Sequence, residues 1–248
     1  MPDMGTAIAV FLVGVAASAV GAMVGGGSLL SIPFLIFLGL PPQVAIATDR
    51  FAGLGAAATA GYRFWRARKI VWRYVPVLAV ASLAGSVIGA SALVRADPGS
   101  LDAVIGVLLV VLVPVLFLSR DLGVAPREVS LLRQALGLAL YFLVQVLAGF
   151  FGGGTLTLIF YILMGFLGVT VTQVVATQIL PFVVLSVSSL ALFATRGLVD
   201  YRLGLVLMAG AAVGGYLGAH IAIASGDRWL RRVFAVVILA SAARLLFW

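Results

Sequence analysis

Two glycine triplets, each followed by a hydroxyl residue, are the sequence features best suited to binding a ligand. They are Gly25, Gly26, Gly27 with Ser28, and Gly152, Gly153, Gly154 with Thr155, and each triplet interrupts a long apolar stretch. Three consecutive glycines disfavour a continuous helix by about 1 kcal/mol each relative to alanine. Where a helix restarts after such a break, its first backbone N–H groups are unpaired and its dipole is positive. We therefore expect both triplets to contribute to an anion-binding site.

Asp49 and Arg50 are the acidic and the basic residue that lie well inside an apolar stretch. A charge at the centre of a membrane helix costs roughly 2.5–3.5 kcal/mol, so an ionisable residue there is a functional candidate. We expect Arg50 to contact an anionic substrate and Asp49 to act in binding or proton coupling. The alternative is mutual neutralisation without a further role, although neighbours on a helix point about 100° apart and cannot form an ideal pair.

Four more polar residues align with these features. Thr48 and Thr177 each follow an alanine, and Gln178 follows Thr177 as Asp49 follows Thr48. Gln145 precedes the second triplet by the same seven positions that separate Ser18 from the first. We expect these four residues to hydrogen-bond the substrate; an interhelical contact is the alternative for each: Thr48, Gln145, Thr177 and Gln178.

The composition describes an all-α integral membrane protein. Of the 248 residues, 63% are hydrophobic and only 10% are charged, with a mean hydropathy of +1.23, whereas soluble domains carry about a quarter charged residues. The length accommodates roughly eight to ten membrane segments of about 20 residues. The net charge of +8 lies in short basic runs between apolar segments, which is typical of cytoplasmic loops and argues against a nucleic-acid partner.

The residues that several enzyme classes require are missing from the sequence. There is no cysteine and a single histidine, His220, so neither a disulfide nor a cluster of metal ligands is available. One membrane-embedded carboxylate is too few for an aspartyl protease, and neither triplet continues into the Gly-Lys-Ser/Thr of a P-loop. We therefore expect no enzyme activity and no cofactor, and for His220 a packing or interfacial role.

The two halves of the chain repeat each other. The glycine triplets lie 127 positions apart, and several other pairs lie 129 apart. The pairs are Gly39 with Gly168, Ala47-Thr48 with Ala176-Thr177, Trp72-Arg73 with Tyr201-Arg202, and Gly85-x-x-x-Gly89 with Gly214-x-x-x-Gly218. Such duplication is common among secondary transporters, whose sites lie between the repeats. We assign residues 1–119 to a first membrane repeat, 120–133 to a cytoplasmic linker and 134–248 to a second membrane repeat.

The relative orientation of the repeats depends on whether the short apolar segment after each triplet crosses the membrane. If it does not cross, each repeat crosses four times and the halves are parallel; if it crosses, each crosses five times and the halves are inverted. The number of Lys and Arg residues on the cytoplasmic side is the same in both arrangements, so the positive-inside rule does not decide between them. We favour inverted repeats, because glycine breaks from antiparallel halves meet naturally near the membrane midplane.

The order of these motifs resembles the TauE/SafE family of sulfite exporters over the whole chain. The resemblance rests on Gly25-Gly26-Gly27-Ser28 through Pro33, on Gly39-Leu40-Pro41-Pro42 through Ala47-Thr48, and on Gly152–Gly154, Ala176-Thr177 and Gly197–Arg202. It implies a multipass transporter of the bacterial inner membrane that carries small sulfur-containing anions such as sulfite, sulfoacetate or other organosulfonates. Family members often have Ser or Asn where Asp49 stands here, whereas Arg50 matches a basic variant.

Three functions stay open at this point. We favour a secondary transporter, and specifically an exporter, with the anion held between the two glycine breaks and protons or sodium as coupling ions. A passive anion channel could use the same parts. A membrane scaffold without transport could instead use the two Gly-x-x-x-Gly stripes for assembly, and a homodimer is compatible with all three.

Overall fold

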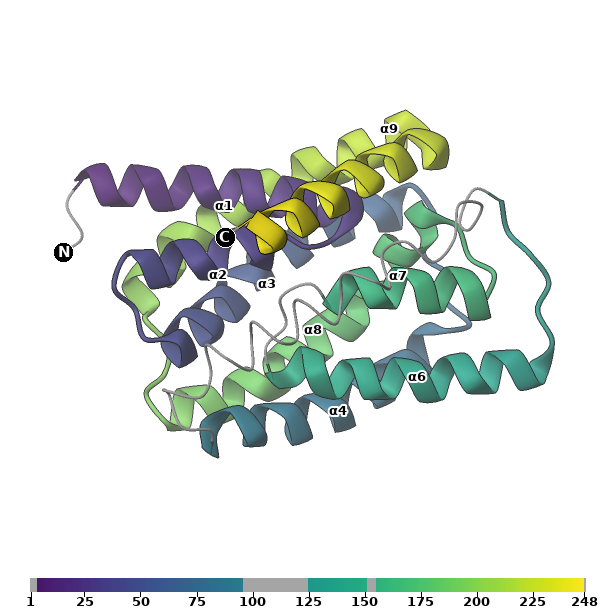
Figure 1. Ribbon diagram of the computed structural model, residues 1–248, viewed down its shortest axis with the longest axis horizontal. Helices are drawn as coiled ribbons and strands as arrows, with labels where there is room; N and C mark the ends of the chain where they lie inside the picture. Colours follow the sequence, from purple (N-terminus) through teal and green to yellow (C-terminus); the bar gives the residue numbers. More distant parts are fainter. Residues whose placement is uncertain (1–3, 96–124, 151–154, 248) are drawn as a thin grey trace.

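The computed structural model describes residues 4–95, 125–150 and 155–247, and within these ranges the regular structure is entirely helical. The chain forms α1 (Met4–Val24), α2 (Ser28–Phe37), α3 (Pro42–Arg66) and α4 (Val75–Arg95) before the first long gap. It continues with α6 (Leu131–Phe150), α7 (Thr155–Phe166), α8 (Val171–Thr195) and α9 (Tyr201–Phe247) (Figure 1). The expected segment 101–118 and the triplet Gly152–Gly154 lie outside the described residues. The first helix of the second half, α6, begins at Leu131, three residues before residue 134, where we expected the second repeat to begin.

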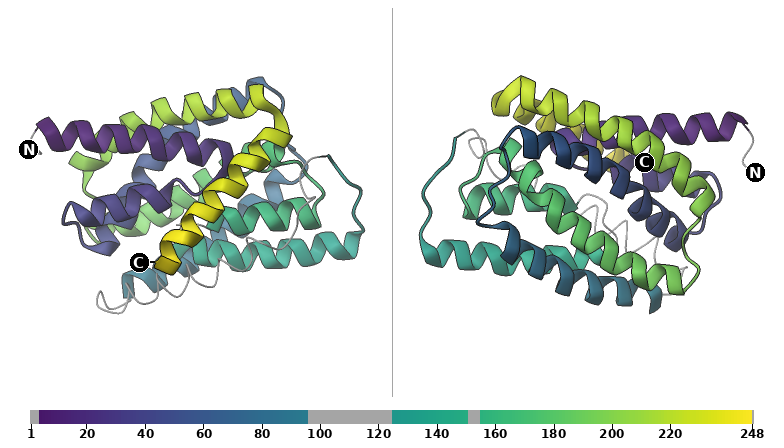
Figure 2. Two further views of the ribbon diagram at one scale, coloured as in Figure 1. Left: turned by 45° about the horizontal axis from the view of Figure 1, so that its top comes forward. Right: turned by 180° about the vertical axis from the view of Figure 1, so that it is seen from behind.

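Local sequence explains where several helices begin and break. Pro42 occupies the first turn of α3, where its missing N–H is not needed. At the start of α8, Thr170 and Gln173 form a reciprocal capping box. Gly226 has a positive φ of 74° inside α9, so this element consists of two helices joined at a sharp bend. Figure 2 shows the second of these helices folding back across the bundle.

Five of the described helical segments are long and apolar enough to cross a membrane. They are Met4–Val24, Val75–Arg95, Leu131–Phe150, Val171–Thr195 and Tyr201–Asp227. Their outward faces carry exposed aliphatic side chains, such as Val80 and Ile88 on α4 and Leu136 and Leu143 on α6. In lipid, backbone groups must be paired within a helix, and exposed apolar side chains are then favourable. The chain is therefore a multipass helical membrane protein.

The fourth helix of each half packs against helices of the other half. α4 lies mainly against α6 and α8, and α9 lies mainly against α1 and α3. Glycines make these approaches close: a Cβ added at Gly89 would lie 2.0 Å from the Val146 carbonyl oxygen, and one at Gly218 would lie 2.3 Å from that of Ala19. The backbones of both helix pairs therefore touch directly, as small residues permit in membranes.

Several helices of the first half precede a helix of the second half by a nearly constant number of positions, and two such pairs run in opposite directions. Both ends of α3 precede those of α8 by 129 positions, and the starts of α1 and α2 precede those of α6 and α7 by 127. In Figure 1, α1 runs from left to right and α6 from right to left, and the first helix of α9, before the bend at Gly226, opposes α4 in the same way. The contacts follow the same pattern, because α4 packs against α6 and α8 whereas α9 packs against α1 and α3.

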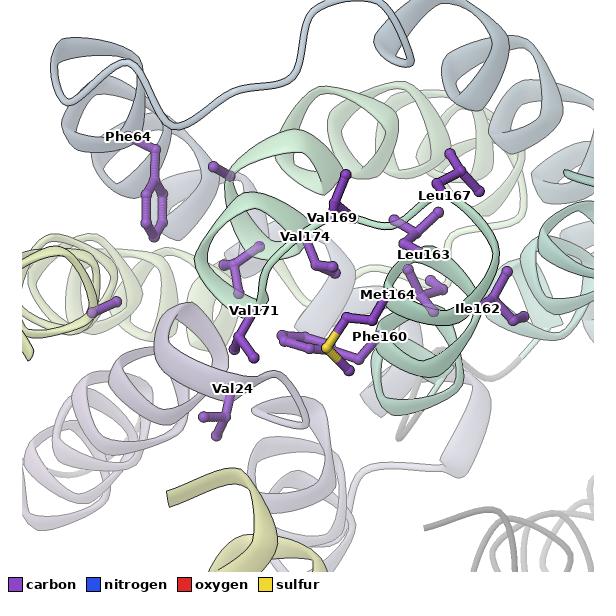
Figure 3. Close-up of a cluster of buried hydrophobic side chains, with 14 of the residues drawn as sticks. Val24, Phe64, Phe160, Ile162, Leu163, Met164, Leu167, Val169, Val171 and Val174 are labelled. Carbon is purple, nitrogen blue, oxygen red and sulfur yellow. The ribbon is translucent and has the colours of Figure 1, made fainter. Parts of the chain in front are cut away.

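Two hydrophobic clusters hold the described part of the bundle together, and both contain residues from the two halves. In Figure 3, Val24 of α1 and Phe64 of α3 face the same cluster as Phe160 and Met164 of α7 and Val174 of α8. Phe64 and Phe160 are fully buried. This packing fixes the ends of α1 and α3 against α7 and α8, and thereby fixes the walls of the cavity described next.

Candidate functional site

A cavity of about 180 Å³ lies at the junction of the two halves. Its walls come from α1, α2, α3, α6, α7, α8 and α9, and most of the lining residues are glycine, alanine or larger apolar residues. The polar residues that line it are Ser18, Ser28, Ser31, Asp49, Arg50, Gln145, Thr155 and Gln178. This volume is several times the share of about 30 Å³ that one water takes in the liquid, which is enough for a small organic anion.

The start of α2 supplies backbone N–H groups to this cavity. Gly25 and Gly26 both have φ of +82°, a conformation that side chains disfavour, and they turn the chain from α1 into α2. Gly26, Gly27 and Ser28 line the cavity. Within the described part of the chain, the N–H groups of these three residues donate to no backbone carbonyl. The positive end of the α2 dipole therefore lies at the cavity.

The start of α7 lies next to the start of α2. A Cβ added at Gly25 would lie 2.9 Å from the side chain of Leu156, the second residue of α7. Thr155, the first residue of α7, lines the cavity together with Leu156. The N-terminal ends of two short helices from different halves thus meet at one space.

Asp49 lies on α3 and is held by two hydroxyls of α2. Ser28 donates to its Oδ2 at 2.7 Å, and Ser31 donates to its Oδ1. Ser28 and Ser31 share one face of α2 because residues three positions apart on a helix are neighbours. Each carboxylate oxygen thereby has a neutral donor, and within the described residues Asp49 makes no ion pair, in agreement with the poor geometry expected for its neighbour Arg50.

Arg50 is buried and reaches across to the other half. Its Nη2 donates to the carbonyl oxygen of Ala148 at 2.5 Å. Ala148 lies on α6, close to the end of its described part, so this hydrogen bond links α3 of the first half to α6 of the second. A guanidinium has five N–H donors, and this is the one hydrogen bond of Arg50 among the described residues.

Gln145 and Gln178 line the cavity on the side of the second half, and they belong to a neutral hydrogen-bonded cluster centred on Tyr141 of α6. The Tyr141 hydroxyl donates to Oε1 of Gln178 at 2.8 Å and accepts a hydrogen bond from Nε2 of Gln145. Nε2 of Gln145 also donates to the hydroxyl of Ser82 at 2.6 Å, and the Ser82 and Tyr141 hydroxyls lie 3.0 Å apart. Oε1 of Gln145 is buried and has no hydrogen-bond partner within the part of the chain that the structure describes.

The residues at the matching sequence offsets are smaller or charged. Offsets of 127 and 129 pair Tyr141 with Gly14, Gln145 with Ser18, Gln178 with Asp49 and Ser82 with Ala211. Gly14, Ser18 and Asp49 of the first half and Ala211 of α9 all line the cavity.

The structure brings most of the expected site residues together. Gly26, Gly27, Ser28, Asp49, Arg50, Gln145, Thr155 and Gln178 all line the cavity. Gly25 lies just behind them, against Leu156. Gly152, Gly153 and Gly154 lie outside the described residues, so their expected role stays a prediction.

Thr48 and Thr177 lie elsewhere. Neither lines the cavity; the Thr48 hydroxyl accepts a hydrogen bond from the N–H of Asp200 at 3.0 Å, and the Thr177 hydroxyl accepts one from that of Val71 at 3.0 Å. Their expected contact with a substrate stays a prediction without support from this geometry. The visible role of both hydroxyls is to hold the chain that leads into α9 and α4.

Sequence reasoning did not include Ser31 or Tyr141 among the site residues. Ser31 follows Ser28 by three positions, and this spacing was the available signal. Tyr141 precedes Gln145 by four positions, so the two side chains lie on one face of α6. No local pattern indicated that Ser82, on α4, would join them.

His220 lies on α9 and contacts α3 rather than the cavity. Its Nδ1 is in hydrogen-bond contact with Nη2 of Arg63, and the Arg63 guanidinium lies 5.0 Å from the centre of the Tyr216 ring. This placement fits a packing role. Among the described residues, no group of three or more His, Cys, Asp or Glu side chains could hold a metal ion.

Comparison with known proteins identifies the family. The model of the family described as sulfite exporter TauE/SafE matches residues 10–245. A probable membrane transporter protein of Haemophilus influenzae is 26% identical over 237 residues, covering 96% of this chain and 93% of its own length. The probable membrane transporter protein YfcA of Escherichia coli K12 is 27% identical, covering 96% of this chain and 88% of its own. A Sinorhizobium protein named probable membrane transporter protein ORF9 is also 27% identical, covering 95% and 90%.

No solved structure matches the chain. The family match spans almost the whole sequence and agrees with the multipass helical fold. The chain belongs to the TauE/SafE family of membrane transporters.

Proposed function

We propose that this chain is a secondary transporter that exports small sulfur-containing anions, such as sulfite, sulfoacetate or other organosulfonates, across the bacterial inner membrane. The anion would occupy the cavity at the junction of the two halves. The observation that carries the proposal is the position of Arg50, a buried cation at the same cavity as the N-terminal ends of α2 and α7.

The charges around the cavity favour an anionic guest. The oxygens of a sulfite or sulfonate group would accept hydrogen bonds from the N–H groups of Gly26–Ser28, and Arg50 would add a positive charge. Helix N-termini bind anions through these same unpaired N–H groups and the dipole. The donors that Arg50 does not use on Ala148 are available to a ligand, because the described residues supply no other partner.

Asp49 is the candidate for ion coupling. An anion that leaves the cell is helped by the inside-negative potential, by roughly 2.3 kcal/mol per charge per 100 mV, so export needs no strong pump. Uptake would need a coupled cation. A proton or a sodium ion on Asp49 would remove a negative charge from the cavity wall and thereby reduce repulsion of the substrate.

We also propose that the two halves of the chain are duplicated repeats with inverted orientation in the membrane. This duplication is supported by the even spacing of corresponding helices, by their opposite directions and by the reciprocal packing of α4 and α9. In transporters built this way, substrate sites lie between the repeats near the membrane midplane. A homodimer is compatible with the arrangement.

Reconstitution in liposomes tests the function. Protein that carries labelled sulfoacetate should show saturable flux and should exchange internal for external substrate; a channel would show neither saturation at low substrate nor counterflow. Arg50→Gln should lower the rate at limiting substrate by at least about 10-fold, as expected when a charge-assisted hydrogen bond is lost.

The matched control is Arg66→Gln, which removes an exposed arginine from the last turn of the same helix. This variant should transport like the wild type. If correctly folded Arg50→Gln protein has unchanged affinity and rate, the positive charge of Arg50 plays no part in binding or transport. Absence of flux for sulfite, sulfoacetate and related sulfonates in the wild type would refute the proposed substrates.

A further inference from the structure

A surface hollow of about 560 Å³ lies at the end of α3, separate from the central cavity. It is lined by Trp65 and Arg66 of the last turn of α3 and by Arg68, Ile70 and Trp72 of the segment that leads into α4. Trp65 is 57% exposed and Trp72 is 55% exposed. Tryptophans that alternate with basic residues beside a membrane span are typical of the lipid–water interface. The hollow therefore opens at the level of the lipid headgroups.

The charge of this region is entirely positive. Five Lys and Arg residues lie between positions 63 and 73, and no Asp or Glu occurs from position 51 to position 96. Arg66 is engaged by Tyr62, because its Nη1 donates to the Tyr62 hydroxyl at 3.0 Å and its guanidinium lies 5.8 Å from the centre of that ring. The side chain of Arg68 makes no hydrogen bond or ion pair within the described residues. The hollow thus presents a guanidinium whose N–H donors are available to a ligand.

Arg68 has a backbone conformation that favours glycine. Its φ is +54°, and in the described part of the chain it is the residue other than glycine with a positive φ. It directly follows the C-cap of α3. Its N–H donates to the carbonyl of Trp65 at 3.0 Å, and the N–H of Lys69 donates to that of Phe64 at 3.1 Å. These two bonds define a Schellman motif, in which this position is usually glycine.

The second half of the chain forms the same motif with glycine. Gly197 lies 129 positions after Arg68, follows the C-cap of α8 and has φ of +65°. Its N–H donates to the carbonyl of Ala194 at 3.1 Å, and the N–H of Leu198 donates to that of Phe193 at 3.1 Å. The turn itself therefore does not require an arginine. A side chain that is kept in a disfavoured conformation indicates a role in binding.

The segment that carries Arg68 is held in place by the rest of the protein. Ile70 and Val71 pack against the hydrophobic cluster that contains Phe64. The N–H of Val71 also donates to the hydroxyl of Thr177 at 3.0 Å. Because the backbone of the hollow is already fixed, a ligand loses little affinity to ordering of the chain.

We propose that this hollow binds the headgroup of an anionic phospholipid. The lipid phosphate accepts hydrogen bonds from Arg68, and the rings of Trp65 and Trp72 contact the glycerol and the first methylene groups of the acyl chains. Basic pockets beside membrane helices bind anionic headgroups in this way. The exposed tryptophans favour a lipid over a free phosphate ion, because the ion has no apolar part to contact them. This site is independent of the proposed transport of sulfur-containing anions.

Thermal unfolding of the purified full-length protein in an uncharged detergent tests the proposal. Dioleoyl phosphatidylglycerol and dioleoyl phosphatidylcholine have the same acyl chains, but only phosphatidylglycerol has a net negative headgroup. We expect phosphatidylglycerol to raise the melting temperature more than phosphatidylcholine does at equal concentration. Native mass spectrometry should show that phosphatidylglycerol is also retained preferentially. Inorganic phosphate should have no effect, and stabilisation by phosphate equal to that by phosphatidylglycerol would overturn the lipid as the occupant.

Variants of Arg68 separate its backbone cost from its binding role. Arg68→Gly and Arg68→Asn both remove the charge, and both residues suit a left-handed backbone better than arginine does. Without lipid, we expect Arg68→Gly to melt at a higher temperature than the wild type. Its affinity for phosphatidylglycerol should nevertheless be about 5-fold lower, the loss expected for one basic residue near an anionic membrane surface. A merely structural role would change the melting temperature and leave the affinity unchanged, whereas Arg68→Lys should retain the lipid preference.

The matched control is Arg196→Gln. Arg196 is the exposed C-cap residue of α8, immediately before Gly197, and it does not line the hollow. This variant loses the same charge and should keep the wild-type affinity for phosphatidylglycerol. An equal loss in Arg196→Gln and Arg68→Gly would show that net charge alone attracts the lipid, and would overturn the site. A wild type that binds the two lipids equally would also overturn it, while the proposed transport function would stand.

Discussion

The hydroxyl of Thr48 accepts a hydrogen bond at 3.0 Å from the backbone N–H of Asp200, the residue that immediately precedes α9. The same bond is found on the other side of the molecule, where Thr177 accepts from Val71 at 3.0 Å. Donors and acceptors of the two bonds are each 129 positions apart in the sequence. Each threonine therefore holds the segment that enters a helix of the other half. Thr48 on α3 binds the segment before α9, and Thr177 on α8 binds the segment before α4.

We expect Thr48→Val and Thr177→Val to destabilise the protein without a direct effect on substrate affinity. Valine keeps the volume but leaves a backbone N–H without its partner, which costs about 1–3 kcal/mol. The free energy of unfolding in detergent, measured by chemical denaturation, checks this. The control is Thr195→Val, whose exposed hydroxyl bonds only to its own helix and whose stability should match the wild type. A loss of affinity with unchanged stability would instead favour direct contact between these threonines and the substrate.

Gly25→Ala should destabilise the protein more than Gly26→Ala. Both glycines have φ of +82°, so both alanines carry the cost of a left-handed conformation, roughly 1–2 kcal/mol. An added methyl group at Gly25 would also lie 2.9 Å from Leu156, whereas at Gly26 the nearest contact is 3.5 Å, to Leu29. Thermal unfolding of the two variants gives the comparison directly. Equal losses would show that the contact between the starts of α2 and α7 is looser than described.

Gly89→Ala and Gly218→Ala should weaken the contacts of α4 with α6 and of α9 with α1. The added methyl groups would overlap backbone carbonyl oxygens, and overpacking of this kind costs about 1–3 kcal/mol. Ala84→Val, on the exposed face of α4, adds volume toward the outside and serves as the control. The measurement is the denaturation midpoint in detergent. If both glycine variants are as stable as the control, the helices do not pack at these positions.

Asp49→Asn should uncouple transport from a cation gradient. The amide keeps the size of the carboxylate and its oxygen can still accept from Ser28 or Ser31, but the group can no longer take up a proton or balance a sodium ion. In liposomes, wild-type uptake should respond to an imposed proton or sodium gradient, whereas the variant should exchange substrate and ignore the gradient. Gradient-driven accumulation that persists in the variant would exclude Asp49 as the coupling residue.

Sequence reasoning identified those parts of the site that depend on local signals. Glycine runs break helices wherever they occur, and buried charges are costly in any membrane helix, so Gly26–Ser28, Asp49 and Arg50 could be recognised without a structure. The direction of a side chain depends on which helices pack together. For that reason the sequence could not indicate that the Thr48 and Thr177 hydroxyls bond the chain leading into α9 and α4, and their expected contact with a substrate stays a prediction.

The packing of helices was the least predictable feature. The Gly-x-x-x-Gly stripes of α4 and α9 indicated close contacts but not their partners, which lie in the other half. The cluster around Tyr141 depends on this exchange, because Ser82 of α4 reaches Gln145 of α6 only across the two halves. Five spans are recognised among the described residues against the eight to ten expected from length, and the expected segment 101–118 lies outside them.

The exchange of α4 and α9 has a consequence for biogenesis. When the ribosome has completed the first half, α1 and α3 still lack the helix that covers their small-residue faces, because α9 is synthesised last. The first helices must therefore insert into the bilayer before the bundle is fully assembled. Until α9 is synthesised, the small-residue faces of α1 and α3 are exposed to lipid. A truncated product that ends before Tyr201 would retain spans able to insert, yet it would be left with an unfilled groove and should be removed by membrane quality-control proteases.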